Sequence, residues 1–344
     1  IPASDVANLS LLGYEPQKYY AGRGPLEAAN MGIPLGPSDV AFRCNLITES
    51  DGNVMDYSAG HITNREAHEL IDHLNDKLSS AEVKFHPGIS YRHLMVYKNG
   101  ADLGLHKLKT AAPHDIMGEP VKKHLPKGKN AEILIELIMR SQEVLTATDI
   151  NRVRVDLDDN PANMIWLWGQ GVNINMPTFK QKFGITGAVI SAVDLIKGLG
   201  VVTGLEVLEV EGATGYYDTN YRGKAEAALD ALERHDFVFV HIEAPDEAGH
   251  NGDVRAKIHA LENIDKIVLG TILAERSLED TRILIAPDHF TPVRVRTHTA
   301  EPVPFVVAGK GIPRSISLTF SEEDAQRSNL YFEEGALLME YFIK

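Results

Sequence analysis

The sequence predicts an α/β protein in which a doubly wound, mainly parallel sheet carries a smaller inserted α+β domain. From residue 163 onward, short apolar strands alternate with helical segments, which is the rhythm of a parallel sheet covered by helices. Between residues 38 and 160, hairpin signals are mixed with amphipathic helices, a pattern typical of an α+β module. The chain of 344 residues is long enough for such a core with an insertion.

The first predicted element is a short apolar helix within residues 4–14, which opens on Ser4. A serine at a helix start is an ordinary N-cap that satisfies free backbone N–H groups, and from the residues alone this role is the preferred interpretation. The alternative is a phosphorylated Ser4, because the helix dipole and the free N–H groups favour a phosphate at this position. Turn-rich segments at 22–25 and 32–37 then predict a domain boundary near residue 36.

Residues 37–160 are predicted to form the inserted domain, and residues 1–36 with 161–344 the core. Thr63 and Glu66 have the spacing of a capping box, which predicts a helix directly after Thr63. The expected strands and helices of the insertion lie at residues 40–49, 54–57, 64–79, 89–98 and 130–146.

Charged and imidazole side chains recur at the turns and strand ends of the inserted domain. Each one alone is typical of a surface residue, but together they suggest a clamp for a phosphorylated or carboxylated ligand. The formal net charge of −14 argues against a nucleic-acid partner, and a small anionic substrate would need such a local cluster. The residues are Arg43, His61, Arg92, His93, His114 and Asp115.

Composition is that of an ordinary soluble globular protein, with 44% hydrophobic and 24% charged residues. The single cysteine, Cys44, excludes an intrachain disulfide and fits a reducing cytoplasm. No segment approaches ~18 uninterrupted apolar residues, so no membrane association is expected. We expect a cytoplasmic protein, and we expect residues upstream of Ile1, because the sequence does not begin with Met.

The remaining core elements alternate as the fold class requires. Trp166 and Trp168 are interpreted as core residues rather than stacking platforms. Gly198, Gly200 and Gly204 follow a helix and miss the dinucleotide fingerprint, so no nucleotide cofactor is expected. The expected elements lie at residues 164–168, 191–199, 205–210, 221–234, 237–242, 252–273, 283–286, 303–307 and 334–342.

Two of the predicted strands, at 236–242 and 283–285, end in side chains that can bind metal ions. The carboxyl ends of parallel strands meet at one edge of a sheet, so we expect these side chains to converge. Carboxylates with imidazoles suit Zn²⁺ or Mn²⁺, and two ions would need about this many ligands. A single Asp-His pair after a strand is more often a capped turn, but burying all of these groups without a cation would be costly. The candidate ligands are Asp246, His250, Asp288, His289 and His298.

Motifs spread over the whole chain closely resemble the archaeal-type cofactor-independent phosphoglycerate mutases, which belong to the alkaline phosphatase superfamily. The motifs are SDVANLSLLGY (4–14), GRGPLEAA (22–29), VAFRCNLIT (40–48), DYSAGHI (56–62), SYRHLMV (90–96), WLWGQG (166–171), GAVISAVDLIKGLG (187–200), GATGYYDTNY (212–221), EAPDEAGHNGD (243–253) and APDH with RTHTAEPVPF (286–305).

The resemblance implies a metal-bearing phosphatase-like core interrupted by a smaller substrate-clamping domain. It implies that Ser4 is the serine that becomes phosphorylated, which reverses the preference for a simple N-cap. The implied metal ligands are, for one site, Asp246, His250 and His298 and, for the second site, Asp288 and His289. The residues implied to hold the phosphoglycerate are Arg43, His61, Arg92, His93, His114, Asp115 and Lys197.

The activity implied by the resemblance is the metal-dependent interconversion of 3-phosphoglycerate and 2-phosphoglycerate through a phosphoserine, a step of glycolysis and gluconeogenesis. The implied cofactors are two divalent ions (Mn²⁺, Zn²⁺ or Mg²⁺), without 2,3-bisphosphoglycerate and without a nucleotide. Relatives described as homoserine kinases share the pattern, so a phosphotransferase with another acceptor is one alternative. A non-catalytic metal-binding protein is the alternative from a different class. The sequence is silent on the native ion and the oligomeric state.

One departure from the family concerns the N-terminal strand. Members of the family open with a strand that ends in an Asp-Gly motif, a few tens of residues before the serine. The Asp of that motif binds the second metal ion. The present sequence has no such segment before Ser4, and we expect the natural protein to contain it.

Overall fold

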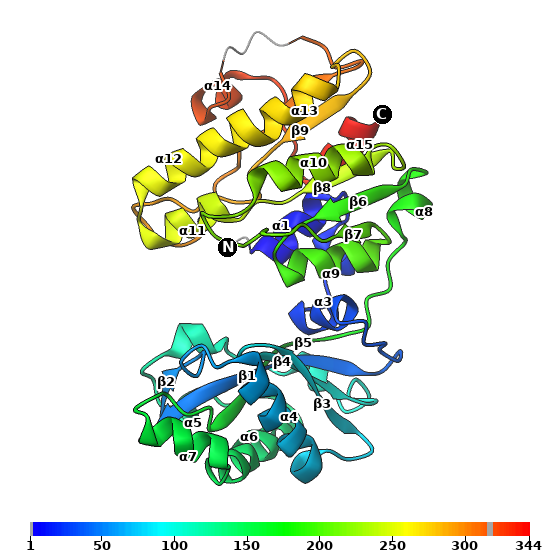
Figure 1. The fold of residues 1–344 in the computed structure, drawn as a ribbon. Coiled ribbons are helices and arrows are strands. Elements are labelled where there is room, and N and C mark those ends of the chain that lie inside the picture. Colours follow the sequence, from blue (N-terminus) through cyan, green and yellow to red (C-terminus); the bar gives the residue numbers. More distant parts are fainter. Residues whose placement is uncertain (1–2, 315–318) are drawn as a thin grey trace. The chain divides into compact units, whose positions relative to one another are not determined.

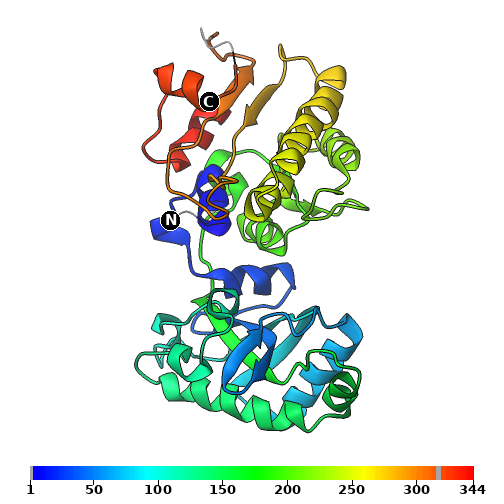
Figure 2. The same ribbon diagram turned by 90° about the vertical axis from the view of Figure 1, so that its left-hand side faces the viewer.

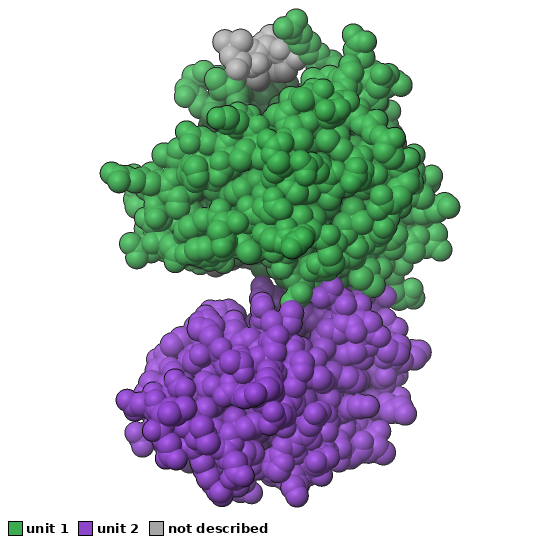
Figure 3. All heavy atoms as spheres, viewed as in Figure 1, with its two compact units in different colours: residues 1–20, 175–344 green, residues 21–174 purple. Residues whose placement is uncertain are grey.

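The computed structural model describes the chain from Ala3 to Lys344 except for residues 315–318. The chain divides into two compact units (Figure 3). Both units combine helices with β-sheets, which confirms the predicted α/β class. No helix in the described part of the chain is long and apolar enough to cross a membrane. Unit 1 comprises residues 1–20 and 175–344, and unit 2 comprises residues 21–174.

Unit 2 is larger than the predicted insertion of residues 37–160. α3 (Arg23–Asn30) precedes the predicted start, and β5 (Met164–Val172) follows the predicted end. β5 pairs with β1 (Val40–Ser50), and α3 packs on both of these strands. Long-range strand pairing therefore extends unit 2 by one helix and one strand.

The sheet of unit 2 is antiparallel, with the order β2-β1-β4-β3 and with β5 pairing on β1. β1 is the longest strand and contacts three others, which places it at the centre of the unit. The predicted hairpin turn is present: Asp51 and Gly52 adopt φ of 51° and 83°, as tight hairpin turns require. The other strands are β2 (Asn53–Asp56), β3 (Val83–Ile89) and β4 (Arg92–Tyr97).

The pleat of β1 gives the sheet two different faces. Phe42 and Cys44 are fully buried in the main hydrophobic core with apolar residues of α4 (Asn64–Leu78) and α6 (Ala131–Thr146). Each fully buried Leu, Ile or Phe of such a core contributes about 1.5–3 kcal/mol. Side chains alternate along a strand, so Arg43 lies on the opposite face, which α3 covers.

Helices of unit 2 begin and end at recognisable signals. The capping box predicted for α4 is present, because the Thr63 side chain and the Glu66 side chain each bind the other residue's backbone N–H. Gly171 permits a close backbone approach, since an added Cβ would lie 1.4 Å from the Ala21 carbonyl oxygen. The remaining helical segments are η1 (Leu105–Lys107), η2 (Pro113–Ile116), α5 (Val121–His124) and α7 (Asp149–Asp156).

Unit 1 contains the predicted parallel strands, in the order β7-β6-β8. The predicted strand at 303–307 is observed as β10 (Val306–Gly309), and it runs antiparallel to β9 (Arg282–Ile285). Among the described residues, parallel pairing is confined to the three-stranded sheet, so the mainly parallel sheet is seen only in part. The strands of that sheet are β6 (Gly187–Ile190), β7 (Glu206–Leu208) and β8 (Phe237–Val240).

The helices of unit 1 flank these strands (Figures 1 and 2). α12 (Val254–Asn263) continues through a π-helical segment, Ile264–Leu269, into α13 (Gly270–Glu275), and α10 (Tyr221–Ala231) packs beside it. α1 (Ser4–Leu11) packs against α9 and α15. The other helices are α2 (Pro16–Tyr19), α8 (Phe179–Phe183), α9 (Asp194–Thr203), α11 (Ala244–Asn251), α14 (Glu322–Arg327) and α15 (Ala336–Ile343).

Candidate active site

Ser4 opens α1, but its side chain does not cap the helix. Ala3 occupies the N-cap position, and no side chain there accepts a capping hydrogen bond. The Ser4 hydroxyl instead lies 3.0 Å from Nε2 of His289. Asn8, one turn later, donates to the Ser4 carbonyl at 2.8 Å and to the Asp288 carboxylate at 2.9 Å. The start of α1 is therefore bonded directly to the segment that follows β9.

The segment after β8 turns at once into α11, which places two predicted ligands on one helix face. Pro245 lies in the first turn, where a helix does not need its missing N–H group. Asp246 and His250 are one turn apart, and the carboxylate lies 3.3 Å from His250 Nε2. Gly249 allows the loop after β9 to approach this helix, because a Cβ there would lie 2.4 Å from the Thr291 carbonyl oxygen.

The loop after β9 brings the other three predicted ligands to α11. His298 Nε2 lies 3.5 Å from the Asp246 carboxylate and 3.2 Å from His250 Nε2. The His289 ring stacks on the His298 ring, with centroids 3.7 Å apart. His289 also approaches both carboxylates, with Nδ1 3.9 Å from Asp246 and Nε2 3.4 Å from Asp288. The five predicted ligands and Ser4 thus lie in one cluster.

This cluster offers the donor atoms that a divalent ion requires. Asp246, His289 and His298 each present a potential ligand atom, and these atoms lie within 4.8 Å of one another. The Nε2 atoms of His250 and His298 face each other, and two imidazole nitrogens beside a carboxylate are the ligands that Zn²⁺ and Mn²⁺ prefer. The residues present therefore fit the metal ions that the sequence implied.

The carboxylates of this region repel one another. Burial raises the pKa of Asp288, and the nearby Asp246 raises it further. Burial also raises the pKa of Glu243 to about 8, with Asp246 and Asp288 adding to the effect. A divalent cation would lower all of these pKa values, because it favours the charged carboxylates.

Two polar residues that support Asp246, one directly and one through the other, were not predicted. The Thr291 hydroxyl donates a hydrogen bond to the Asp246 carboxylate. Lys257 of α12 donates to the Thr291 carbonyl at 2.7 Å. No sequence pattern marks Lys257, although Thr291 lies within the same loop as the predicted ligands.

A second unpredicted group lies at the carboxyl ends of β6 and β8. His241 Nδ1 is 3.2 Å from the Ser191 hydroxyl, and its Nε2 is 3.3 Å from the Glu243 carboxylate. Lys224 of α10 donates to the His241 carbonyl at 3.0 Å. Ser191 and His241 each follow a parallel strand directly, and this position was the signal that could have identified them.

Unit 2 gathers cationic side chains around Trp168. The Arg43 guanidinium lies 4.5 Å from the Trp168 ring centroid, and that of Arg23 lies 5.7 Å away. The His114 ring meets the same indole edge-on at 5.5 Å. Glu27 pairs with Arg43 at 2.8 Å. Trp168 is buried as predicted, but it also serves as the platform for these cations, a role that the sequence interpretation rejected.

A tyrosine pair extends this group on the same unit. The ring of Tyr57 lies 5.6 Å from that of Tyr91 and 6.1 Å from that of His114. His61 and Arg92 approach Tyr91 at 6.0 Å and 5.7 Å. The structure thus gathers four of the predicted substrate-binding residues, Arg43, His61, Arg92 and His114.

His93 does not join them, although it is the neighbour of Arg92 in sequence. Adjacent residues of a strand point to opposite faces, and His93 is buried on the other side of β4. Its Nδ1 accepts a hydrogen bond from the Gly88 N–H at 2.9 Å. Burial lowers the pKa of His93 to about 3. His93 is thus a neutral, packed histidine.

Two further predicted substrate-binding residues have other partners. Lys197, on α9 of unit 1, pairs with Glu209 at 2.7 Å, and the structure links it with neither cluster. Asp115 lies beside His114 at 3.7 Å, but its side chain is 72% exposed and negative. Asp115 can therefore accept hydrogen bonds from a ligand but would repel its anionic groups.

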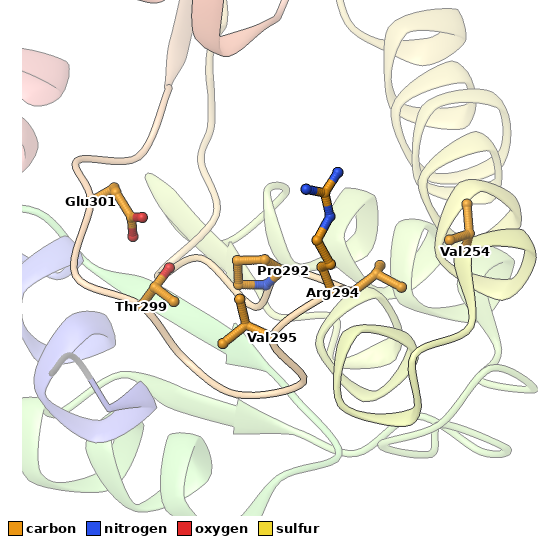
Figure 4. Close-up of a pocket in the computed structure, with 7 residues that line it drawn as sticks. Val254, Pro292, Arg294, Val295, Thr299 and Glu301 are labelled. Carbon is orange, nitrogen blue, oxygen red and sulfur yellow. The ribbon is translucent and has the colours of Figure 1, made fainter.

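A pocket of about 650 Å³ lies in unit 1 between the start of α12 and the loop after β9 (Figure 4). None of the predicted ligands lines it, although Pro292 and Thr299 adjoin cluster residues in sequence. Its walls are mostly apolar, and Arg294 and Glu301 add one charge of each sign. The lining residues are Val254, Pro292, Val293, Arg294, Val295, Thr299 and Glu301.

A serine hydroxyl beside aspartates and histidines at strand ends is typical of metal-dependent enzymes that transfer or hydrolyse phosphoryl groups. Comparison with known proteins narrows this class. Residues 1–151 match the family described as 2,3-bisphosphoglycerate-independent phosphoglycerate mutase. The enzyme of that name from Methanosarcina mazei is 50% identical, over 100% of this chain and 86% of its own length. The probable enzyme of that name from Geobacter sulfurreducens is also 50% identical, over 99% and 86%.

Solved structures agree with these relatives. The PH0037 protein from Pyrococcus horikoshii is similar with a TM-score of 0.83 and 30% identity, covering 99% of this chain and 82% of that one. The cofactor-independent phosphoglycerate mutase from Thermoplasma acidophilum has a TM-score of 0.64 and 25% identity, covering 99% and 86%. The chain belongs to the 2,3-bisphosphoglycerate-independent phosphoglycerate mutase family, which confirms the resemblance found in the sequence.

Proposed function

We propose that this protein interconverts 3-phosphoglycerate and 2-phosphoglycerate through a phosphoserine at Ser4. The observation that carries the proposal is the position of the Ser4 hydroxyl, 3.0 Å from His289 and at the N-terminus of α1. Free N–H groups and the helix dipole at this end favour a bound phosphate. The names of the relatives support phosphoglycerates as the substrates. We place this activity in the cytoplasm, because a single cysteine, which forms no intrachain disulfide, fits a reducing compartment.

The metal centre proposed for this reaction uses two divalent ions, Mn²⁺, Zn²⁺ or Mg²⁺. When bound, such ions supply positive charge for the transferred phosphoryl group and lower the pKa of a coordinated hydroxyl. Asn8 orients the Asp288 carboxylate, and the imidazole of His289 orients the Ser4 hydroxyl. The ligands proposed are Asp246, His250 and His298 for one ion and Asp288 with His289 for the other.

In unit 2, we propose that Arg43, Arg92 and His114 bind an anionic group of the phosphorylated substrate. A guanidinium binds a carboxylate or a phosphate through two hydrogen bonds. Trp168 holds the Arg43 guanidinium at 4.5 Å, so little side-chain freedom is lost when a ligand binds. Glu27 pairs with Arg43 at 2.8 Å, and the grouped guanidinium and imidazole side chains stand out in a protein of net charge −14.

We also propose that β6, β7, β8, β9 and β10 belong to one doubly wound sheet, completed by the N-terminal strand that the family resemblance implies. Among the described residues, β8 pairs only with β6 and β9 only with β10, so each has a free edge. All four residues of β9 are only half-buried, although Ile283, Leu284 and Ile285 are apolar. An additional strand between β8 and β9 would cover these side chains and, as the resemblance implies, carry an Asp that binds the second ion.

The proposal is tested with Ser4→Ala in the full-length protein. We expect mutase activity to fall by about 10³-fold or more, because the covalent phosphate carrier is lost. Mass spectrometry after incubation with 3-phosphoglycerate should find phosphate on Ser4 in the unaltered protein and none in the variant. Ser10→Ala, at the other end of α1, is the matched control and should keep its activity. A Ser4→Ala variant with substantial activity would rule out the phosphoserine.

A further inference from the structure

A fully buried lysine lies beside the proposed metal centre without a part in the reaction described above. Lys224, on α10, is 1% exposed, and its ammonium donates to the His241 carbonyl at 3.0 Å. Burying an ammonium group is costly unless negative charge compensates for it. The acidic start of α11 follows His241 in the chain, and Glu243 at that start interacts electrostatically with Lys224.

The start of α11 carries more negative charge than one metal site uses. Glu243, Asp246 and Glu247 each offer a carboxylate oxygen, and these oxygens lie within 4.8 Å of one another. Asp246 is the one that contacts His250, His289 and His298. Glu243 and Glu247 are two further acidic groups beside it.

The contacts of His241 include the Glu243 carboxylate, which also lies close to Asp246. Glu243 occupies the N-cap of α11, but its side chain makes no capping hydrogen bond. Its carboxylate lies 3.3 Å from His241 Nε2, while His241 Nδ1 lies 3.2 Å from the Ser191 hydroxyl. One tautomer satisfies both contacts: Nε2–H donates to Glu243, and Nδ1 accepts from Ser191. The same histidine also presents its carbonyl to Lys224.

We infer that Lys224 is a built-in cation of the metal centre, which neutralises Glu243 and so leaves Asp246 to the metal ion. The inference rests on the metal centre proposed above and assigns it a fixed positive charge. Lys224 is a positioning residue in this role and touches no reacting atom. Electrostatic coupling supports the pairing, because Glu243 opposes the burial that lowers the pKa of Lys224 to about 8.

The inference predicts that removing the charge of Lys224 strengthens Mn²⁺ binding. In Lys224→Met, the repulsion between the ammonium and a bound cation is gone, so Mn²⁺ affinity should rise by about tenfold. The metal-free variant should have a lower Tm, because Glu243 loses its counter-charge, and Mn²⁺ should restore that Tm. A residue that only fills space would lower both the affinity and the Tm.

The experiment measures Mn²⁺ binding by calorimetry at pH 7, where Lys224 is charged, with the full-length protein, first unaltered and then as variants. Glu243→Gln should weaken Mn²⁺ binding, and the double variant with Lys224→Met should bind about as the unaltered protein does. Arg222→Met is the matched control, since Arg222 lies on the same helix with a 65% exposed side chain, and it should leave the affinity unchanged.

Each outcome decides between the inference and a rival role for Lys224. An unchanged or reduced Mn²⁺ affinity in Lys224→Met would overturn the inference. Weaker binding of inorganic phosphate with unchanged Mn²⁺ affinity would do the same and would make Lys224 a substrate ligand. If Lys224→Met does not fold, an unchanged Mn²⁺ affinity in Glu243→Gln would also overturn the inference. Absence of Mn²⁺ binding by the unaltered protein would instead overturn the metal centre itself.

Discussion

The two clusters of this protein use opposite charges and are assembled in different ways. In unit 1, carboxylates and imidazoles converge from Ser4 to His298, almost the whole length of the chain. In unit 2, guanidinium groups and aromatic rings lie on one face of a single sheet, around Trp168. The first arrangement suits cations and the second suits anions. In a protein with a net charge of −14, unit 2 thus carries a group of cationic side chains that we propose as the site of an anionic ligand.

The difference shows which structural rule positions each kind of site. The unit 1 cluster depends on topology, because strand ends and the first turns of α1 and α11 meet at one place. The unit 2 cluster depends on the pleat, which selects Arg43 and Arg92 and sends His93 to the opposite face. A substitution in the first cluster should therefore affect metal binding, and a substitution in the second should affect substrate binding.

Asp246→Asn should have the largest effect of the substitutions that test this contrast. Asp246 approaches three imidazoles at 3.3, 3.9 and 3.5 Å, so its charge is central to the proposed metal site. We expect a loss of activity of about 10³-fold and weaker Mn²⁺ binding, since an amide is a poorer ligand than a carboxylate. Steady-state assays and calorimetry measure the two effects. Glu262→Gln, an exposed change on α12, is the control.

Arg92→Ala should have a smaller and different effect. The loss of one guanidinium that binds an anion should raise KM about tenfold, with Mn²⁺ affinity unchanged. The proportion of substrate hydrolysed rather than isomerised should also rise, because the intermediate is held less firmly. Arg140 is an exposed residue of α6. Arg140→Ala removes the same charge and should change neither the KM nor the proportion hydrolysed. Weaker Mn²⁺ binding in Arg92→Ala would contradict the proposal that the unit 1 cluster binds the metal ions and the unit 2 cluster binds the substrate.

Local sequence signals predicted much of this structure. The capping box at Thr63 and Glu66 and the turn at Asp51 and Gly52 are present, because each depends on a few neighbouring residues. The rule that parallel strands end at one edge led to the grouping of five ligands, which the structure brings together. Their roles as metal ligands stay predictions.

Other features depend on contacts that a single sequence does not encode locally. β5 joins unit 2 because it pairs with β1, more than a hundred residues earlier in the chain. Lys224 and Asn8 belong to helices whose patterns give no sign of the groups they meet. Trp168 has the burial expected of a core residue and also supports Arg43, and burial alone cannot separate these roles.

The smallest expected effect concerns His93, which sharpens the contrast between the faces of β4. Burial lowers its pKa to about 3, from 6.5 in an exposed chain, so the unfolded state binds a proton that the folded state excludes. The contribution of neutral His93 to the free energy of unfolding is complete above pH 6.5 and declines as the pH falls toward 3. By pH 5 the loss amounts to about 2 kcal/mol.

His93→Asn should remove this dependence, because an amide does not titrate, while its oxygen can still accept from the Gly88 N–H. Both tryptophans of the chain lie in unit 2, so their fluorescence during urea unfolding reports on that unit. At pH 8 the two proteins differ only by the packing cost of the substitution, and that difference is the reference for pH 5. We expect the variant to lose less stability between these pH values and to retain its KM. A raised KM with an unchanged pH slope would instead place His93 with Arg92 among the ligand-binding residues.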